Sequence, residues 1–160
     1  MQEVGLRRLR AEDVDWLTRA HGRLYARDEG FDGSFEGLVG EVLAAFLASH
    51  DPARERGFIA WRNGQRLGSI FCTCEDAETS RLRLFLLLPQ ARGQGLGRWM
   101  LGRCMGFARA AGYRRMVLAT HRSHAAACAL YARTGWQLTQ SRPVTRFGVA
   151  LEEVHWQIDL

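Results

Sequence analysis

The chain contains no lysine, and all 22 of its basic residues are arginine. Without lysine the chain cannot form a P-loop, which needs a Gly-Lys-Ser/Thr ending. The arginines are dispersed rather than gathered in one block, which disfavours a nucleic-acid-binding arm, so we do not expect nucleic acid as a partner. A net charge of +5 would still attract anions, polyphosphates among them, to the surface.

Long apolar runs are missing as well. No stretch approaches the ~20 residues that a membrane-spanning helix needs, and residues 1–7 lack an apolar signal core. We therefore expect a cytoplasmic protein without a membrane partner. The four cysteines match neither the common zinc spacings nor a disulfide framework, so we expect buried thiols and no bound metal: Cys72, Cys74, Cys104 and Cys128.

Repeats, low-complexity tracts and linkers are absent too, so a single domain over residues 1–160 is expected. The first third of the chain predicts a short strand over 4–9, a helix from Ala11 to Tyr25 and a second helix from Ser34 to Leu47. Ser34 is the expected N-cap of the second helix. The intervening segment 28–33 is expected to break the two helices apart.

The rest of the chain alternates strands and helices. Asn63-Gly64 predicts a hairpin turn between strands 57–61 and 67–74. The apolar end of strand 81–88 is typical of a central strand that is buried on both faces. Further elements are expected as a helix from Gly95 to Ala111, a strand over 116–119, a helix over 125–133, and strands over 136–139 and 154–158.

A glycine-rich turn, Arg92-Gly93-Gln94-Gly95-Leu96-Gly97, lies between the central strand and the next helix. Unpaired N–H groups at a helix start can bind a pyrophosphate, and glycines let the backbone approach it closely. Arg92 and Arg98 would add positive charge. A dinucleotide fold would place such a turn after its first strand, whereas this turn follows an antiparallel hairpin.

This turn gives the chain a resemblance to a known family. Arg92-x-x-Gly95-x-Gly97 is similar to the signature of the GNAT family of N-acetyltransferases, and Leu130-Tyr131-x-x-x-Gly135-Trp136 is similar to a later family element. Segments 24–27, 51–56 and 147–148 most resemble the acetyltransferase part of MarR-type regulator fusions. The resemblance implies one α+β acyl-CoA N-acyltransferase domain, with a mostly antiparallel mixed sheet flanked by helices.

The resemblance also implies the reaction and its donor site. An acetyl group would pass from acetyl-CoA, a co-substrate, to a primary amine of a small-molecule or peptide acceptor by direct attack. The backbone of three central-strand residues would hold the acetyl and pantetheine portions, and His124 stands where many members carry asparagine. The expected cofactor-binding residues are Phe85, Leu86, Leu87, Arg92, Gly93, Gln94, Gly95, Leu96, Gly97, Arg98 and His124.

The catalytic and acceptor residues follow from the needs of the reaction. Tyr131, with an ordinary pKa near 10, would protonate the departing thiolate, although a core tyrosine is the alternative interpretation. Glu75 and His121 are the candidates for the general base, unless water relays the proton. Tyr25, Glu29 and Phe31, near the break between the first two helices, are candidates for acceptor binding.

Two other functions remain open at this point. One is a non-catalytic acyl-CoA-binding regulatory module, which the likeness to regulator fusions suggests. The other is acetylation of aminoacyl-tRNA, which only the basic charge suggests. A homodimer through the C-terminal strands is the expected assembly, because two-fold dimers are the commonest soluble oligomers.

Overall fold

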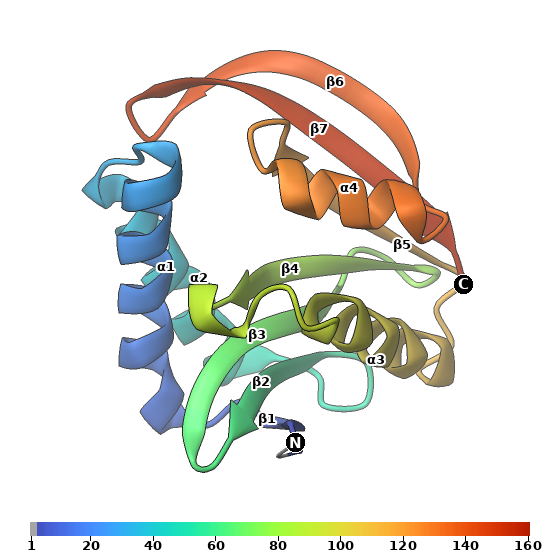
Figure 1. The fold of residues 1–160 in the computed structure, drawn as a ribbon. Helices are drawn as coiled ribbons and strands as arrows, with labels where there is room; N and C mark the ends of the chain where they lie inside the picture. Colours follow the sequence, from blue (N-terminus) through green and yellow to red (C-terminus); the bar gives the residue numbers. More distant parts are fainter. Residues whose placement is uncertain (1–2) are drawn as a thin grey trace.

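One seven-stranded sheet forms the centre of the computed structural model, which describes residues 3–160 (Figure 1). The strand order is β1-β2-β3-β4-β5-β7-β6. Within these residues all neighbouring strands are antiparallel except β4 and β5, which are parallel. The expected mixed, mostly antiparallel sheet is confirmed. The strands are β1 (Gly5–Arg8), β2 (Arg56–Arg62), β3 (Gln65–Cys74), β4 (Thr79–Leu87), β5 (Arg115–His121), β6 (Gln137–Arg146) and β7 (Val149–Asp159).

Helices cover both faces of this sheet. Side chains alternate between the two faces along each strand, so Ile59 and Phe71 pack with α1 and α2, whereas Ala60 and Cys72 pack with α3. Two hydrophobic cores result, one on each side. The helices are α1 (Val14–Glu29), α2 (Gly33–Ser49), α3 (Leu96–Ala110) and α4 (Ala125–Arg133), with short 3₁₀ turns η1 (Ala11–Asp13) and η2 (Pro89–Ala91).

Local turn chemistry explains most element boundaries. Asn63 and Gly64 adopt φ angles of 53° and 73°, as a two-residue hairpin turn requires, so the predicted β2–β3 hairpin is confirmed. Helix α1 ends at Gly30, whose φ is 74°. The N-cap of α2 is Asp32 rather than the expected Ser34, because the Asp32 carboxylate accepts the N–H of Ser34 at 3.0 Å.

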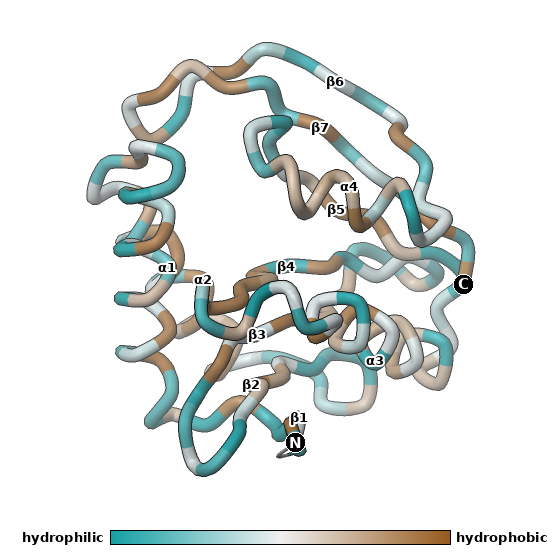
Figure 2. Tube along the Cα trace, viewed as in Figure 1, coloured by the Kyte–Doolittle hydropathy of each residue, from teal (hydrophilic) through white to brown (hydrophobic). Residues whose placement is uncertain are grey.

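The C-terminal hairpin is much longer than the predicted strands 136–139 and 154–158. Strands β6 and β7 pair from Gln137 to Arg146, and Phe147 and Gly148 turn the chain with φ angles of 54° and 76°. Strand β6 is the outer strand and is exposed almost throughout, and Figure 2 shows it as mostly hydrophilic. The prediction fell short because a polar edge strand lacks the apolar alternation that marks a strand in the sequence.

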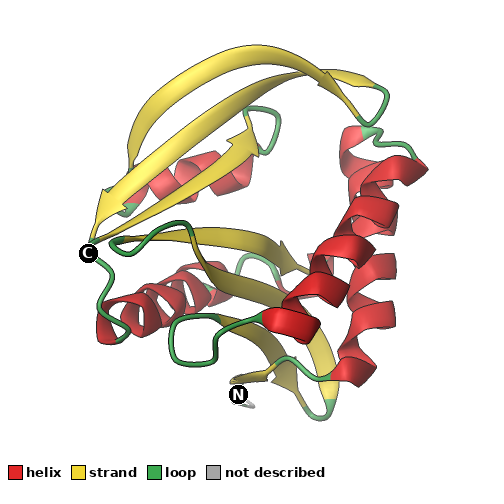
Figure 3. Ribbon diagram, turned by 180° about the vertical axis from the view of Figure 1, so that it is seen from behind, coloured by secondary structure: helices red, strands yellow, loops and turns green. Residues whose placement is uncertain are grey.

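Strands β4 and β5 diverge soon after they meet. Their parallel pairing covers only Thr79–Arg81 with Arg115–Val117, and beyond it the strands spread apart toward α1 and α2 (Figure 3). We call this region, beyond Arg81 and Val117, the β4–β5 fork. Because the helices α3 and α4 follow these two strands, the fork lies between the starts of both helices.

The four cysteines differ in their exposure. Cys72 and Cys104 are buried as expected, but Cys74 is exposed because β3 ends there and leaves the core, and Cys128 is half-buried.

No helix among residues 3–160 combines the length and the apolar character that a membrane crossing requires.

Candidate functional site

The glycine-rich turn presents free N–H groups at the start of α3. Gly93 and Gly95 adopt φ angles of 76° and 79°, and a Cβ on either would meet no atom within 4 Å. The first helical hydrogen bond runs from Trp99 N to Gly95 O at 3.1 Å. The N–H groups of Leu96, Gly97 and the next residue therefore have no partner inside the helix, and open space lies in front of the turn.

Side chains tie this turn to its neighbours. Arg92 donates from Nε to Leu87 O at 2.9 Å, and its Nη1 lies 3.7 Å from Asp28 at the end of α1. Gln94 accepts from Arg62 at 3.3 Å. The turn is thus fixed to the end of β4, while Arg98 is exposed to solvent. This arrangement leaves Arg98 available to an anion.

Strand β4 carries a bulge at the fork. Ser69 lies opposite Leu86 and Phe71 lies opposite Arg83, so two residues of β4, Leu84 and Phe85, face one residue of β3. The φ of Leu84 is 49°, a conformation that leucine rarely adopts. A bulge of this kind leaves backbone groups without ladder partners.

The bulge residue Leu84 is followed by the three β4 residues that were expected to hold the donor. Phe85 and Leu87 face α3, and Leu86 faces α1 and α2. Leu84 was missed by the sequence prediction, because no residue pattern marks a leucine for a positive φ. The buried Ser69 donates its hydroxyl to Leu84 O at 2.6 Å and so supports the bulge from β3.

Tyr131 is buried on α4, with 3% of its surface exposed. Its ring packs against Trp136 and Trp156, at centroid distances of 5.4 and 6.0 Å. Burial raises the pKa of the Tyr131 phenol above its usual value of 10, and the nearby Tyr25 adds to this effect. The phenol is therefore protonated at neutral pH, as a general acid must be.

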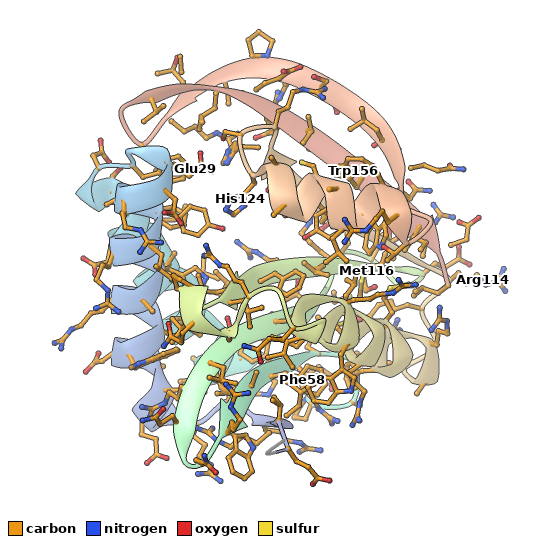
Figure 4. All side chains as sticks on the ribbon, in the orientation of Figure 1. Glu29, Phe58, Arg114, Met116, His124 and Trp156 are labelled. Carbon is orange, nitrogen blue, oxygen red and sulfur yellow. The ribbon has the colours of Figure 1, made fainter. Side chains whose placement is uncertain are left out.

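Glu29, at the end of α1, faces His124, at the start of α4. Figure 4 shows the Glu29 side chain on α1 and the His124 side chain at the start of α4 turned toward the same space. His124 Nε2 lies 3.8 Å from the Glu29 carboxylate, whose side chain is only 6% exposed. The ring of Tyr25 packs on His124 with centroids 4.9 Å apart. Burial lowers the pKa of His124, and Glu29 opposes this shift.

His121 ends β5 beside the loop that joins α1 to α2. The ring of Phe31 meets His121 edge-on at 5.6 Å and packs on Phe147 at 4.9 Å. The tip of the C-terminal hairpin is also bonded to this loop, since Asp32 N donates to Phe147 O at 2.9 Å. Burial lowers the pKa of His121, so the ring is neutral at pH 7.

The structure therefore brings most of the expected residues together. Tyr25, Glu29 and Phe31 lie close to His121 and His124, through the ring contacts and the Glu29–His124 pair given above. Phe31 is 4% exposed, and its ring packs against other aromatic rings of α2 and of the C-terminal hairpin.

Glu75 does not join this group. It lies in the turn before β4 and forms an ion pair with Arg81 at 2.7 Å, whereas His121 lies at the far end of β5. The hydrogen bond from Arg81 lowers the pKa of Glu75. A carboxylate with a lowered pKa that is already paired is a poor proton acceptor, so the expected role of Glu75 as a base is not supported.

Glu153 is a buried carboxylate that was not predicted from the sequence. Glu153 on β7 is 3% exposed and lies opposite His121 in the β5–β7 register. Its oxygens lie 3.0 Å from Arg142, 2.7 Å from Arg146 and 2.8 Å from His155. Because Glu153, Arg142 and Arg146 lie in the unpredicted part of the β6–β7 hairpin, the sequence offered no signal for the cluster.

Comparisons with known proteins agree with this geometry. The model of the Acetyltransferase (GNAT) family matches residues 6–136, whereas no curated protein matches the sequence. Similar solved structures include an acetyltransferase from Streptococcus agalactiae, with 18% identity, a TM-score of 0.79 and coverage of 100% of both chains. Such identities indicate a shared fold.

Two further similar structures were solved with ligands. Spermidine N-acetyltransferase from Vibrio cholerae, in complex with CoA and spermine, is 18% identical, with a TM-score of 0.75 and coverage of 98% of this chain and 95% of that one. A GNAT acetyltransferase from Elizabethkingia anophelis with acetyl-CoA bound is 18% identical, with a TM-score of 0.70 and coverage of 98% of both chains. Since the family model spans most of its length, the chain belongs to the acetyltransferase (GNAT) family.

Proposed function

We propose that the protein transfers an acetyl group from acetyl-CoA to a primary amine of a small-molecule or peptide acceptor by direct attack. The amine nitrogen forms a bond to the acetyl carbon, the carbon–sulfur bond breaks, and the amine gives up a proton. CoA leaves as a thiol once its sulfur gains a proton. The residues of this chain must therefore bind the donor, hold the acetyl group and move two protons.

The donor side is supported by the turn and the bulge. The N–H groups at the start of α3 suit a pyrophosphate, and Arg92 and Arg98 add charge beside them. The backbone of β4 from Phe85 to Leu87 runs from the bulge to this turn, along the path that the pantetheine and acetyl portions would take. The Elizabethkingia anophelis and Vibrio cholerae structures, which hold acetyl-CoA and CoA, support the same donor.

Two residues are proposed for the proton transfers. Tyr131, whose burial raises its pKa, keeps its proton at neutral pH and would give it to the sulfur. His121, whose burial lowers its pKa, is neutral at pH 7 and would accept the proton of the amine, directly or through water. Tyr25 and Glu29 would line the acceptor path between them.

One observation carries the proposal: strands β4 and β5 part beside a bulge whose residue Leu84 has a positive φ. The test has two steps. Thermal shift with acetyl-CoA and with CoA first measures binding. Release of free thiol with a panel of amines, with the acetylated product identified by mass spectrometry, then measures turnover.

The alternative is a non-catalytic acyl-CoA-binding regulatory module, which fits the likeness to the acetyltransferase part of MarR-type fusions. The same experiment separates the two. Stabilisation by acetyl-CoA with no thiol release from any amine would favour the module, and amine-dependent thiol release would favour the enzyme.

We also propose a homodimer through the C-terminal strands. Strand β6 is one of the two outer strands of the described sheet, and its residues are exposed almost throughout. Light scattering at several protein concentrations tests this assembly, and a monomer at the highest concentration would contradict it.

A further inference from the structure

A groove of about 420 Å³ lies between α2 and the strands β3 and β4. Its apolar wall includes Phe46, Phe71 and Leu84. Leu84 is the bulge residue, and it packs with the core on the α1 and α2 side of the sheet. The groove therefore reaches the bulge from the face opposite α3 and the glycine-rich turn.

Most charged groups that line the groove already have partners. Glu75 pairs with Arg81 at 2.7 Å. Glu55 accepts the backbone N–H groups of Asp51 and Cys74, each at 3.0 Å. Glu75 is therefore paired directly with Arg81, and Glu55 is held in place by backbone groups of the chain. The remaining carboxylate, Glu41, lies exposed on α2.

Arg83 is different. Its guanidinium forms no ion pair or hydrogen bond with any residue between positions 3 and 160 that the structure describes. It follows Arg81 by two positions, so both side chains lie on the groove face of β4. Arg83 is exposed along the groove, and its charge is repelled by that of Arg81 and attracted by that of Glu75.

Among the described residues, Arg83 therefore has a guanidinium without a direct partner close to the bulge at Leu84. Arg81 is paired directly with Glu75, whereas Glu75 attracts the charge of Arg83 without a direct contact. An exposed guanidinium without a direct partner is available to an anion that enters the groove. A guanidinium also presents its N–H groups in a planar fork that matches a carboxylate or a phosphate.

We propose that Arg83 binds an anionic group of the acceptor, a carboxylate or a phosphate, while the acceptor amine reaches the bulge at Leu84. This inference rests on the proposed function. Because Arg83 directly precedes Leu84, the anion and the amine must lie within one side-chain length of each other. The acceptor is then a small amine with an acidic group close to its nitrogen, as in an α-amino acid.

The test compares each acidic acceptor with its uncharged counterpart. One arm uses L-amino acids and their carboxamides, and the other uses phosphoethanolamine and ethanolamine, so that the arms separate a carboxylate from a phosphate. Thiol release gives kcat/KM for wild type, Arg83→Gln and Arg83→Lys. Arg109→Gln, an exposed arginine on α3 across the sheet, is the matched control.

We expect wild type to favour one acidic series by about 10- to 100-fold in kcat/KM, as charge-assisted hydrogen bonds allow. Arg83→Gln should remove this preference by raising KM for the acids, with no change for the uncharged acceptors. Arg83→Lys should restore part of it, and Arg109→Gln should behave as wild type.

Two results would overturn the inference while the proposed function stands. One is equal turnover of acidic and uncharged acceptors, and the other is an acid preference that survives in Arg83→Gln. A lack of thiol release with every member of both series, despite binding of acetyl-CoA, would also overturn this inference. The proposed function itself fails only if the wider amine panel gives no thiol release either.

Discussion

The carboxylate of Glu29 lies 3.8 Å from Nε2 of His124, so the end of α1 and the start of α4 approach each other beside the β4–β5 fork. Helix α1 carries Glu29, which is expected to contact the acceptor. His124, at the start of α4, is expected to contact CoA. This pair therefore joins the two halves of the proposed site.

Replacing Glu29 by glutamine should lower the pKa of His124 further. The Glu29 charge raises that pKa against the effect of burial, and glutamine keeps the shape but not the charge. An NMR titration of the histidine rings measures the change directly. Glu41→Gln, on the exposed side of α2, is the control and should leave His124 unaltered. An unchanged His124 titration in Glu29→Gln would show that the pair does not form in solution.

Tyr131→Phe should lower kcat by about 100-fold, in the range of a general acid, with little change in the affinity for acetyl-CoA. The ring packing on Trp136 and Trp156 is kept, so only the proton is lost. Tyr113→Phe is the matched control, because Tyr113 lies between α3 and β5, outside the proposed site, and donates to Arg54 O at 2.9 Å. It should cost about 1 kcal/mol of stability and leave kcat unchanged. Full turnover by Tyr131→Phe would remove this residue from the mechanism.

Ser69→Ala should weaken catalysis through the bulge. The Ser69 hydroxyl donates to Leu84 O at 2.6 Å, and without it the strained backbone at Leu84 can relax. Thr73→Val removes the same kind of bond between the same strands, from Thr73 Oγ1 to Arg81 O at 3.1 Å. Each variant should lose about 1 kcal/mol of unfolding free energy. Only Ser69→Ala should also reduce kcat, and equal kcat values in both variants would argue against the positioning role.

Gly95→Ala should weaken the binding of acetyl-CoA. Its φ of 79° costs an alanine about 1–2 kcal/mol, so the turn would shift and move its N–H groups, although a Cβ meets no neighbouring atom. Gly106→Ala lies in the exposed middle of α3, also without neighbours, and should stabilise the helix by about 0.5–1 kcal/mol. Calorimetric titration with acetyl-CoA compares the two. Unaltered affinity in Gly95→Ala would mean that the turn does not bind the donor.

These residues also show what sequence reasoning could reach. The glycine-rich turn was predictable because a short string of residues determines its local conformation, and Tyr131 was singled out by the family resemblance of the segment around it. The bulge at Leu84, the pairing of Glu75 with Arg81 and the cluster around Glu153 depend on strand register. Register is set by contacts between distant segments, and the polar strand β6 carries no apolar pattern from which to infer it.

The stability of the fold should fall between pH 6.5 and pH 4 because of His21. This ring is 1% exposed, its Nδ1 donates to Leu17 O at 2.9 Å, and burial lowers its pKa from 6.5 to about 4. Below pH 6.5 the unfolded chain takes up a proton that the folded chain does not, so unfolding becomes easier as the pH falls. The loss is at most about 1.4 kcal/mol per pH unit until the folded pKa is reached.

His21→Phe should remove this contribution, since a phenyl ring fills a similar space among Tyr25 and Phe35 and cannot take up a proton. A smaller slope should remain, because burial lowers the pKa of His121 and of His124 as well. His50→Phe is the control: His50 makes the same kind of bond, to Phe46 O at 2.8 Å, but its ring is only half-buried. Urea unfolding at several pH values measures the slope for each protein. If wild type and His21→Phe lose stability equally between pH 6.5 and pH 4, the buried ring is not the source, because a neutral phenyl ring cannot produce a proton-linked loss.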